Sequence, residues 1–331
     1  MLERFDAYME RCLYDPERGF YSGGYGSAGR RRGDFITSPE VGPLFADVVL
    51  AAVEGWWDAL GRPAPLTVYD VGSGPGTLRR ALEGAAASSA AVAEVRAVDR
   101  APAVGVSTAG LPADLSGAVV VANELLDNCP VRIVERTDVG WSEVWVRTDA
   151  EHGRTEVDEE LQPLPDRPAR LDAELERVVP GTRLPVLDAA AELVAGVLAR
   201  RPVVLAAFDY GARATAELAE RGGWLRTYRN HERGTDPYAQ PGRWDITSDV
   251  AVDQLPAPDE VVNQASFLTR WGIEELVEEG RRYWMSHAAA PDVEALRMRS
   301  RVREAEALLD PDGLGSWLVC TWTDIGVSQR N

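Results

Sequence analysis

The stretch VYDVGSGPGTLRRAL, residues 68–82, constrains the fold of this chain more than any other. An apolar run ends at Asp70 and is followed by Gly72, Gly74 and Gly76, and then by a segment with helical spacing. Short apolar runs of this kind are typical of strands that are buried on both faces of a parallel sheet. A strand, a glycine turn and a helix in this order predict the first unit of a doubly wound α/β sheet.

The same alternation of strands and helices continues along the chain. We predict further core strands at residues 93–99, 117–125, 203–211 and 315–322, and helices at residues 5–13, 44–60, 77–85, 187–200, 213–221, 267–279 and 292–309. Residues 131–149 predict a β-hairpin, residues 156–176 an exposed excursion, and residues 225–250 a loop-rich stretch. The predicted fold class is therefore α/β, a Rossmann-like sheet with helices on both faces and an α+β insertion that caps it.

These elements divide the chain into four parts. We predict an N-terminal helical lid segment at 1–65, a nucleotide-binding core at 66–130 and 181–224 with 314–325, a hairpin insertion at 131–180, and a cap with C-terminal helices at 225–313. Parts of the first, third and fourth segments are expected to cover the carboxyl edge of the sheet, where ligands bind in doubly wound folds.

The spacing of the three glycines favours one class of ligand over another. A dinucleotide-binding loop has the pattern G-x-G-x-x-G, but in this chain Thr77 occupies the position of the third glycine. Asp70 would also face the anionic phosphates of a nicotinamide cofactor, whereas S-adenosylmethionine (SAM) offers an ammonium group and a sulfonium cation. Asp99, at the next predicted strand end, suits the ribose hydroxyls. SAM is the favoured cofactor; a nicotinamide cofactor, or glycines needed only for helix packing, are the less favoured alternatives.

Charge and composition limit the partners. The net charge of −18 disfavours a nucleic-acid substrate and favours a basic one, such as an arginine-bearing protein, although acidic surfaces often serve solubility alone. Three scattered cysteines and three scattered histidines predict neither a disulfide framework nor a metal site, and favour a reducing, cytoplasmic compartment. The sequence contains no apolar run long enough to cross a membrane, and it is compatible with a homodimer.

Segments along nearly the whole chain resemble one family. The segments are GDFITSPEVGPLFAD, YDVGSGPGTL, VVANELLDNCPV, AAFDYG, LRTYRNH with GRWDIT, NQASFLTRWGI and LLDPDGLG. In this order they resemble the MidA-type SAM-dependent methyltransferases, whose mitochondrial members dimethylate an arginine of a respiratory complex I subunit during its assembly.

Three features depart from the family's pattern. The segment after Asp99 is short, LLDNCP replaces the usual residues after an Asn-Glu pair, and Asp249 stands where a histidine is common. The methyl acceptor can therefore differ from that of the mitochondrial members, and a degenerate protein without turnover stays open.

The resemblance and the expected strand ends give a set of site residues. Glu124 and Asp127 follow a core strand at the carboxyl edge of the sheet, where carboxylates can bind a guanidinium and accept its proton, so we predict them as catalytic. A polar turn with no catalytic role is the alternative. The resemblance places Thr37, Ser38 and Pro39 at the methionine end of the cofactor, with Ser38 as the expected helix N-cap. The remaining predicted contacts are Asn123 for the cofactor, and Glu40, Asp209, Tyr210, His231, Asp245 and Thr247 for the cleft.

Together these observations predict a class I SAM-dependent methyltransferase acting on an arginine side chain of a partner protein. A small-molecule methyltransferase and a SAM-binding assembly scaffold without turnover are the alternatives.

Overall fold

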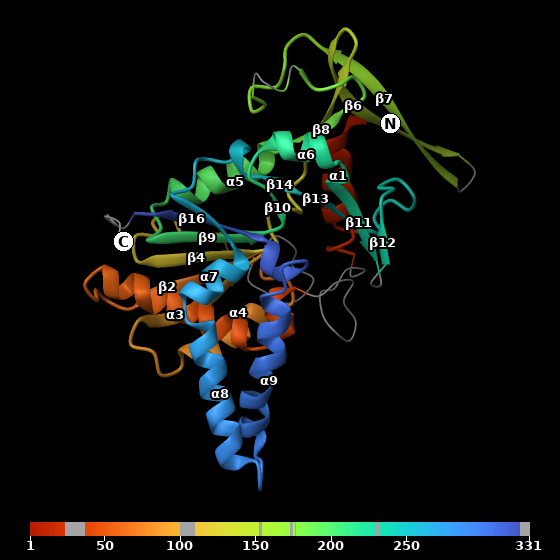
Figure 1. The fold of residues 1–331 in the computed structure, drawn as a ribbon. Coiled ribbons are helices and arrows are strands. Elements are labelled where there is room, and N and C mark those ends of the chain that lie inside the picture. Colours follow the sequence, from red (N-terminus) through yellow and green to blue (C-terminus); the bar gives the residue numbers. More distant parts are fainter. Residues whose placement is uncertain are drawn as a thin grey trace.

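A six-stranded sheet forms the centre of the part of the chain that the structure describes (Figure 1). The structure is a computed structural model, and it describes residues 1–23, 37–99, 110–151, 154–172, 175, 177–229 and 232–324. The strands lie in the spatial order β15 (Glu260–Asn263), β16 (Leu318–Thr323), β9 (Val204–Asp209), β4 (Ala118–Asn123), β2 (Leu66–Val71) and β3 (Val92–Val98). The four strands from β9 to β3 are parallel, and β16 is antiparallel to β9.

The strands of this sheet are buried on both faces because their apolar side chains alternate between two cores. Along β4, Val119 and Val121 belong to the core on one face, and Val120 and Ala122 to the core on the other. The helices α3 (Leu44–Ala59), α4 (Thr77–Ala86) and α7 (Gln264–Arg270) cover the first face, and α5 (Asp188–Leu198) covers the second (Figure 1). The predicted α/β class is confirmed, with α1 (Phe5–Tyr14) and the core strands close to their expected positions.

A second, antiparallel sheet holds the predicted hairpin. In the described residues it contains five strands: β1 (Leu2–Arg4), β5 (Arg132–Thr137), β6 (Gly140–Glu151), β7 (Arg154–Leu164) and β8 (Arg183–Val186). The hairpin of β5 and β6 is confirmed, and the exposed excursion predicted after it begins with a strand rather than with a loop. That strand is β7, which pairs along β6, so its charged side chains lie on an edge strand.

The stretch predicted as loop-rich also folds into strands. The strands β12 (Glu232–Gly234), β11 (Leu225–Arg229) and β13 (Asp245–Ser248) form an antiparallel sheet, and β10 (Gly211–Ala212) pairs in parallel with β14 (Val250–Ala251). The short helix α6 (Thr215–Arg221) follows β10, and single 3₁₀ turns cover Val252–Gln254 and Leu314–Ser316. The sequence did not predict this sheet because its strands are short and are separated by polar turn residues.

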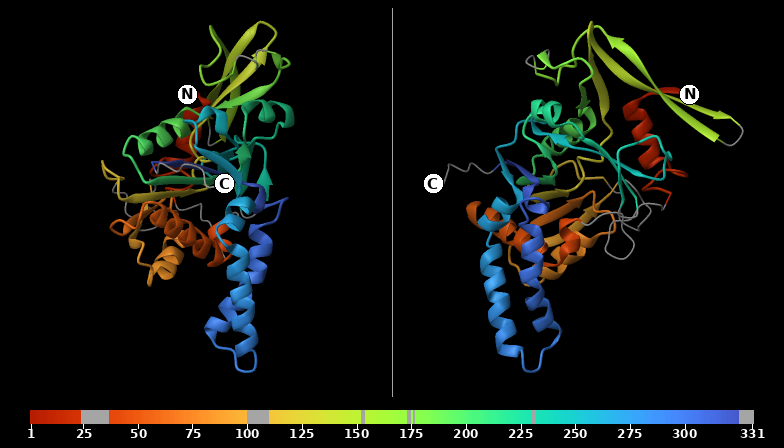
Figure 2. Two further views of the ribbon diagram at one scale, coloured as in Figure 1. Left: turned by 60° about the vertical axis from the view of Figure 1, so that its left-hand side comes forward. Right: turned by 45° about the vertical axis from the view of Figure 1, so that its right-hand side comes forward.

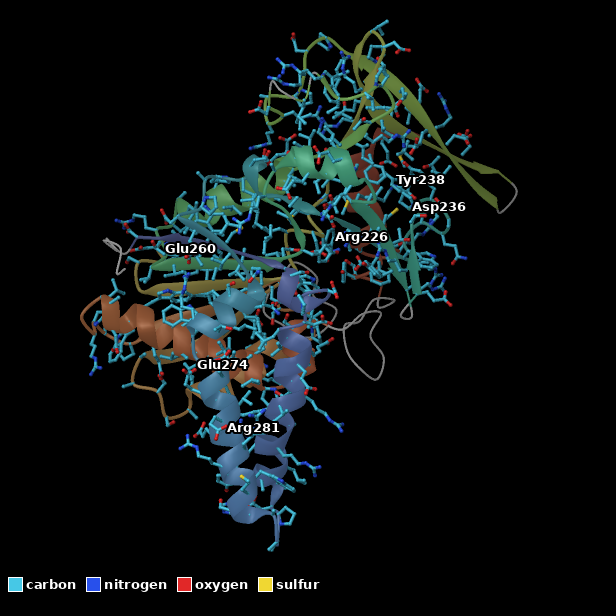
Figure 3. All side chains as sticks on the ribbon, in the orientation of Figure 1. Arg226, Asp236, Tyr238, Glu260, Glu274 and Arg281 are labelled. Carbon is cyan, nitrogen blue, oxygen red and sulfur yellow. The ribbon has the colours of Figure 1, made fainter. Side chains whose placement is uncertain are left out.

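Two helices form an arm that projects from the body (Figure 2). They are α8 (Ile273–His287) and α9 (Val293–Leu308), which the sequence predicts as helices, although the first was expected to be continuous with α7. The break falls at Gly272, whose φ of +88° lies in the left-handed region. In Figure 3, Glu274 and Arg281 lie on this arm, whereas Arg226 lies on β11 in the body. None of the described helices combines the length and the apolar composition needed to cross a bilayer.

Candidate active site

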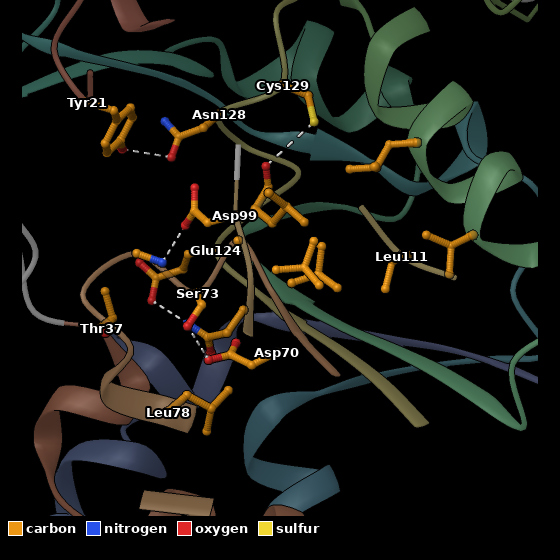
Figure 4. A pocket seen from close by; sticks show the side chains of 18 of the residues that line it. Tyr21, Thr37, Asp70, Ser73, Leu78, Asp99, Leu111, Glu124, Asn128 and Cys129 are labelled. Carbon is orange, nitrogen blue, oxygen red and sulfur yellow. Dashed lines mark hydrogen bonds between the residues drawn. The ribbon is translucent and has the colours of Figure 1, made fainter. Parts of the chain in front are cut away.

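A cavity of about 750 Å³ opens at the carboxyl ends of β2 and β4 (Figure 4). The strands β3 and β4 are the two neighbours of β2, one on each side. At such a point in a doubly wound sheet, the connections after adjacent strands run in opposite directions and leave a crevice at the carboxyl edge. The volume is in the range of small-molecule sites. The described residues of its wall come from the glycine loop, the short helix α2 (Ser38–Val41), the turn after β4, the N-terminal segment and α5.

The glycine loop needs its glycines for two different reasons. Gly72 has a φ of +73°, and a Cβ there would lie 2.7 Å from Cδ1 of Leu125, so this position requires both the left-handed backbone and close packing. Gly74 has a φ of +49°, and no atom lies within 4 Å of its hypothetical Cβ, so the backbone is bare toward the cavity. Gly76 is the N-cap of α4 and is not part of the described cavity wall. A ligand can therefore approach the loop most closely at Gly74.

Asp70 holds this loop while it also lines the cavity. One of its oxygens, Oδ2, accepts hydrogen bonds from the Ser73 hydroxyl at 2.8 Å and from the Arg79 backbone N–H at 3.1 Å. Only 2% of Asp70 is exposed, and burial raises the pKa of its carboxyl to about 6. Asp70 therefore carries an electrostatic cost that a cationic ligand would relieve.

Asp99 faces Asp70 across the glycine loop. It follows β3, lines the cavity, and accepts a hydrogen bond from the Gly74 N–H at 2.6 Å. The two acids and the bare backbone at Gly74 thus meet on one wall, as their positions at adjacent strand ends predict.

The short helix α2 supplies another part of the cavity wall. Thr37, Pro39 and Glu40 line the cavity, whereas the Ser38 hydroxyl is buried and donates to Gln264 Oε1 at 2.9 Å. The N-cap is Thr37, one residue earlier than expected, because Thr37 has the extended backbone of a cap and Ser38 is already helical. The Glu40 carboxylate accepts from the Thr37 N–H at 3.3 Å, which holds the start of the helix in place.

Glu124 is the carboxylate that the turn after β4 presents to the cavity. It has a φ of +52°, unusual for a residue other than glycine, and its N–H donates to the Phe208 carbonyl at 2.9 Å. Its Oε1 accepts a hydrogen bond from Asn123 Nδ2 at 3.0 Å. Burial, followed by the nearby charges of Asp127 and Asp209, holds the pKa of Glu124 well above its ordinary value.

Asp127 and Asp209 lie behind this wall rather than on it. Asp127 accepts from the Tyr210 hydroxyl at 2.6 Å, and burial raises its pKa to about 6. Asp209 accepts from the backbone N–H groups of Leu126, Asp127 and Tyr210 at 2.9, 3.3 and 3.1 Å. Asp127, Asp209 and Tyr210 are absent from the described cavity wall, and Asp209 serves as a brace for the turn that presents Glu124.

Asp245 is also buried away from the cavity. Its carboxylate accepts from Asn128 Nδ2 at 2.9 Å, and its other oxygen lies 2.9 Å from the Tyr21 hydroxyl. Thr247 is buried beside it in β13. The predicted cleft residue His231 and residues 100–109 of the short segment after Asp99 lie outside the described residues. The rest of that segment is described, and its Gly110 and Leu111 line the cavity.

Several cavity residues were missed by sequence reasoning. Tyr14, Tyr21 and Asn128 line one end, and another end is lined by Glu192, Leu193 and Val197 of α5 and by Arg200 just after it. The two tyrosines flank the segment DPERGF, and this pair of aromatic residues around a predicted turn was the only feature of the sequence that could have indicated their place in the cavity wall. Nothing in the pattern of α5 distinguishes its cavity side chains from ordinary core positions.

The observed site fits SAM. The cavity size suits the molecule, two acids meet at the glycine loop, and Asn123 Oδ1 is a buried oxygen of the cavity wall without a hydrogen-bond partner among the described atoms. An acceptor oxygen, a raised aspartate pKa and bare backbone are suited to a ligand that carries an ammonium group, hydroxyls and a sulfonium.

Comparisons with known proteins agree with this assignment. Residues 108–270 match a family model described as "Putative S-adenosyl-L-methionine-dependent methyltransferase". A crystal structure from Burkholderia thailandensis, described as a methyltransferase candidate bound to S-adenosylhomocysteine, is 27% identical, superposes with a TM-score of 0.81, and covers 98% of this chain and 88% of its own.

Curated relatives point the same way. The mitochondrial protein arginine methyltransferase NDUFAF7 homolog of Drosophila melanogaster is 25% identical over 93% of this chain and 78% of its own. The mitochondrial protein arginine methyltransferase NDUFAF7 of Danio rerio is 25% identical over 82% and 73%.

The sheet, the cavity and these similarities define a class I methyltransferase that uses SAM as its cofactor. Within that class, the chain is similar to the MidA-type family, as the order of its motifs predicts.

Proposed function

We propose that this methyltransferase acts on an arginine side chain of a partner protein. The observation that supports this most directly is Glu124, a carboxylate on the cavity wall whose pKa is raised by burial and by Asp127 and Asp209 behind it. Like-charged neighbours in a partly enclosed site favour the entry of a cation. The relatives described as protein arginine methyltransferases add weight to a guanidinium as that cation.

The cofactor would lie along the glycine loop and the neighbouring ends of β2, β3 and β4. Asp99 would bind the ribose hydroxyls, Asp70 the ammonium group directly or through water, and Asn123, Thr37 and Pro39 would contact the methionine end. Gly76 and Ser38 would act indirectly, by holding the glycine loop and α2 in place. When bound, SAM supplies an electrophilic methyl group on a sulfonium.

Glu124 would act as the general base of the reaction. A guanidinium stays protonated at neutral pH, and the nitrogen that gains the methyl group must lose a proton. Glu124 would bind the cation, hold one nitrogen toward the cofactor and accept that proton. Asp127 and Asp209 would keep the pKa of Glu124 high, which makes it a better base once ionised. Turnover should therefore rise with pH as Glu124 loses its own proton.

The test is the variant Glu124→Gln, with labelled methyl transfer from SAM into the proteins of a cell lysate as the readout. Mass spectrometry of digested acceptors should place the label on arginine for the wild type. The variant should lose at least about a hundredfold in turnover, the typical contribution of a general base. Its affinity for S-adenosylhomocysteine, measured by calorimetry, should stay within about threefold.

Glu306→Gln, an exposed position on α9, is the matched control and should keep wild-type turnover. If the label is found only in small molecules, the methyl acceptor is a metabolite rather than a protein. Binding of S-adenosylhomocysteine without transfer to any acceptor would favour an assembly scaffold. Unchanged turnover in Glu124→Gln would remove this residue from the mechanism.

The cytoplasm stays our prediction for the compartment. All three cysteines are free thiols, as a reducing compartment allows. The curated relatives are described as mitochondrial.

A further inference from the structure

The aromatic end of the cavity has a geometry that suits one kind of cation. We infer that Tyr14 and Tyr21 form the acceptor-binding wall and select a flat guanidinium over the compact ammonium of lysine. This inference rests on the proposed function, and it assigns specificity to two residues of the N-terminal segment.

The two tyrosine rings form a stacked pair on the cavity wall. Their centroids lie 5.8 Å apart with an interplanar angle of 20°, and both residues line the cavity. Phe20 packs edge-on against Tyr21, with centroids 5.1 Å apart and planes at 82°, and is itself buried. The pair is therefore backed by the core and has a fixed orientation.

The tyrosine hydroxyls are already engaged by the protein. The Tyr14 hydroxyl donates to the Asn128 carbonyl at 3.1 Å, and the Tyr21 hydroxyl lies 2.9 Å from both Asn128 Oδ1 and Asp245 Oδ2. Asn128 is in turn held by Asp245 and by the Ile246 carbonyl, which its Nδ2 reaches at 2.9 and 3.3 Å. What the pair offers a ligand is therefore ring surface rather than a free hydroxyl.

The same turn connects the aromatic wall to the carboxylate. Asn128 lies four residues after Glu124, and both residues line the cavity (Figure 4). A guanidinium is planar, so it can place its face on a tyrosine ring while its N–H edge binds a carboxylate. An ammonium is a compact, strongly hydrated charge that gains less from a ring face. A ring wall and a carboxylate on one cavity therefore favour arginine over lysine.

The test uses two small acceptors, N-acetyl-arginine amide and N-acetyl-lysine amide, titrated calorimetrically into the protein saturated with S-adenosylhomocysteine. The wild type should bind the arginine compound more tightly. Tyr14→Leu should weaken that binding about three- to thirtyfold, the range of a cation–π contact. Tyr14→Phe keeps the ring and should stay within about threefold of the wild type.

Tyr14 is the better position for substitution because Tyr21 contacts the buried carboxylate of Asp245, and removing that hydroxyl risks the fold. Tyr283→Leu is the matched control, since Tyr283 lies on the projecting arm, where it stacks on His287 at 4.1 Å. The affinity for S-adenosylhomocysteine should be the same in the wild type and in every variant.

Different outcomes separate this inference from the proposed function. If the arginine compound binds in a way that depends on Tyr14 but no methyl group is transferred, the inference is supported and the proposed function is wrong. If arginine is methylated but Tyr14→Leu binds the arginine compound as the wild type does, the proposed function is supported and the inference is wrong. The inference is also overturned if the wild type binds neither compound, if both compounds lose affinity equally, or if Tyr14→Leu weakens S-adenosylhomocysteine binding.

Discussion

The two ends of the cavity are built in different ways. At the cofactor end, Asp70 contacts Ser73 and Arg79, three and nine residues away, and Asp99 contacts Gly74, 25 residues away. At the acceptor end, the hydrogen bonds of Asn128 and Asp245 join segments 107 to 224 residues apart: Tyr14 to Asn128, Tyr21 to Asn128, Asn128 to Asp245, and Tyr21 to Asp245.

This difference has an energetic consequence. Contacts between distant segments close long loops, so they form only when most of the chain has folded. Contacts within one strand–loop–helix unit depend on that unit alone. Substitutions at the acceptor end should therefore lower the stability and turnover of the whole protein. Those at the glycine loop should also change cofactor affinity, with effects on stability that depend on local packing and charge.

The largest effect is expected for Asp209→Ala. Its buried carboxylate accepts three backbone N–H groups in and beside the turn that presents Glu124, and alanine would leave all three without this partner. We expect a loss of about 2–4 kcal/mol in the free energy of unfolding. Turnover should fall with it, while S-adenosylhomocysteine binding stays within about threefold.

Denaturant unfolding measures the loss of stability, and Asp209→Asn, which keeps one acceptor oxygen, should lose less. If Asp209→Ala unfolds at the wild-type denaturant concentration, the acceptor end does not depend on this brace.

A smaller effect of opposite sign is expected for Asp70→Asn. In the folded chain the pKa of Asp70 is about 6, above its ordinary value of 3.8, so the folded state holds this proton more tightly than the unfolded state does. The cost of ionisation is absent below about pH 4 and complete above about pH 6, where two pKa units correspond to at most about 3 kcal/mol. The variant should be more stable than the wild type by about 1–3 kcal/mol at pH 8.

That gain should vanish near pH 4, which denaturant unfolding at the two pH values would show. The same variant should bind S-adenosylhomocysteine more weakly if Asp70 receives the ammonium group. Equal stability of the two proteins at pH 8 would contradict the electrostatic cost assigned to Asp70.

The smallest loss of stability is expected for Gly74→Ala, and it is compared with that of Gly72→Ala. In Gly72→Ala the new Cβ meets Leu125 in a left-handed backbone, so stability should fall by about 2 kcal/mol or more. In Gly74→Ala the new Cβ meets open space, so stability should fall by only about 1 kcal/mol. If the cofactor lies against this bare backbone, Gly74→Ala should weaken S-adenosylhomocysteine binding more than its stability loss suggests.

Thermal unfolding and calorimetry of the two variants provide the comparison. The reverse order, with the greater loss of stability in Gly74→Ala, would show that the loop is packed differently from the structure described here.

The central sheet was predictable because its signal is local. The apolar runs of β2, β4 and β9 lie in strands buried on both faces, and such runs predict parallel strands without knowledge of their partners. The edge strand β7 and the strand β11, which lies between β12 and β13, carry charged residues and pair with segments chosen by tertiary contacts, so their sequences resemble loops. The N-cap was misplaced by one residue because Thr37 and Ser38 are both good capping residues.

The sequence by itself determined the glycine loop, the acids at two adjacent strand ends and SAM as the cofactor, since these features lie within short segments whose backbone chemistry is local. Only the tertiary structure decided which acids face the cavity. A φ of +52° presents Glu124 to the cavity, whereas Asp127, Asp209 and Asp245 are buried behind the wall. It also brought Tyr14 and Tyr21 to the acceptor end, because the hydrogen bonds that hold them join residues more than a hundred positions apart.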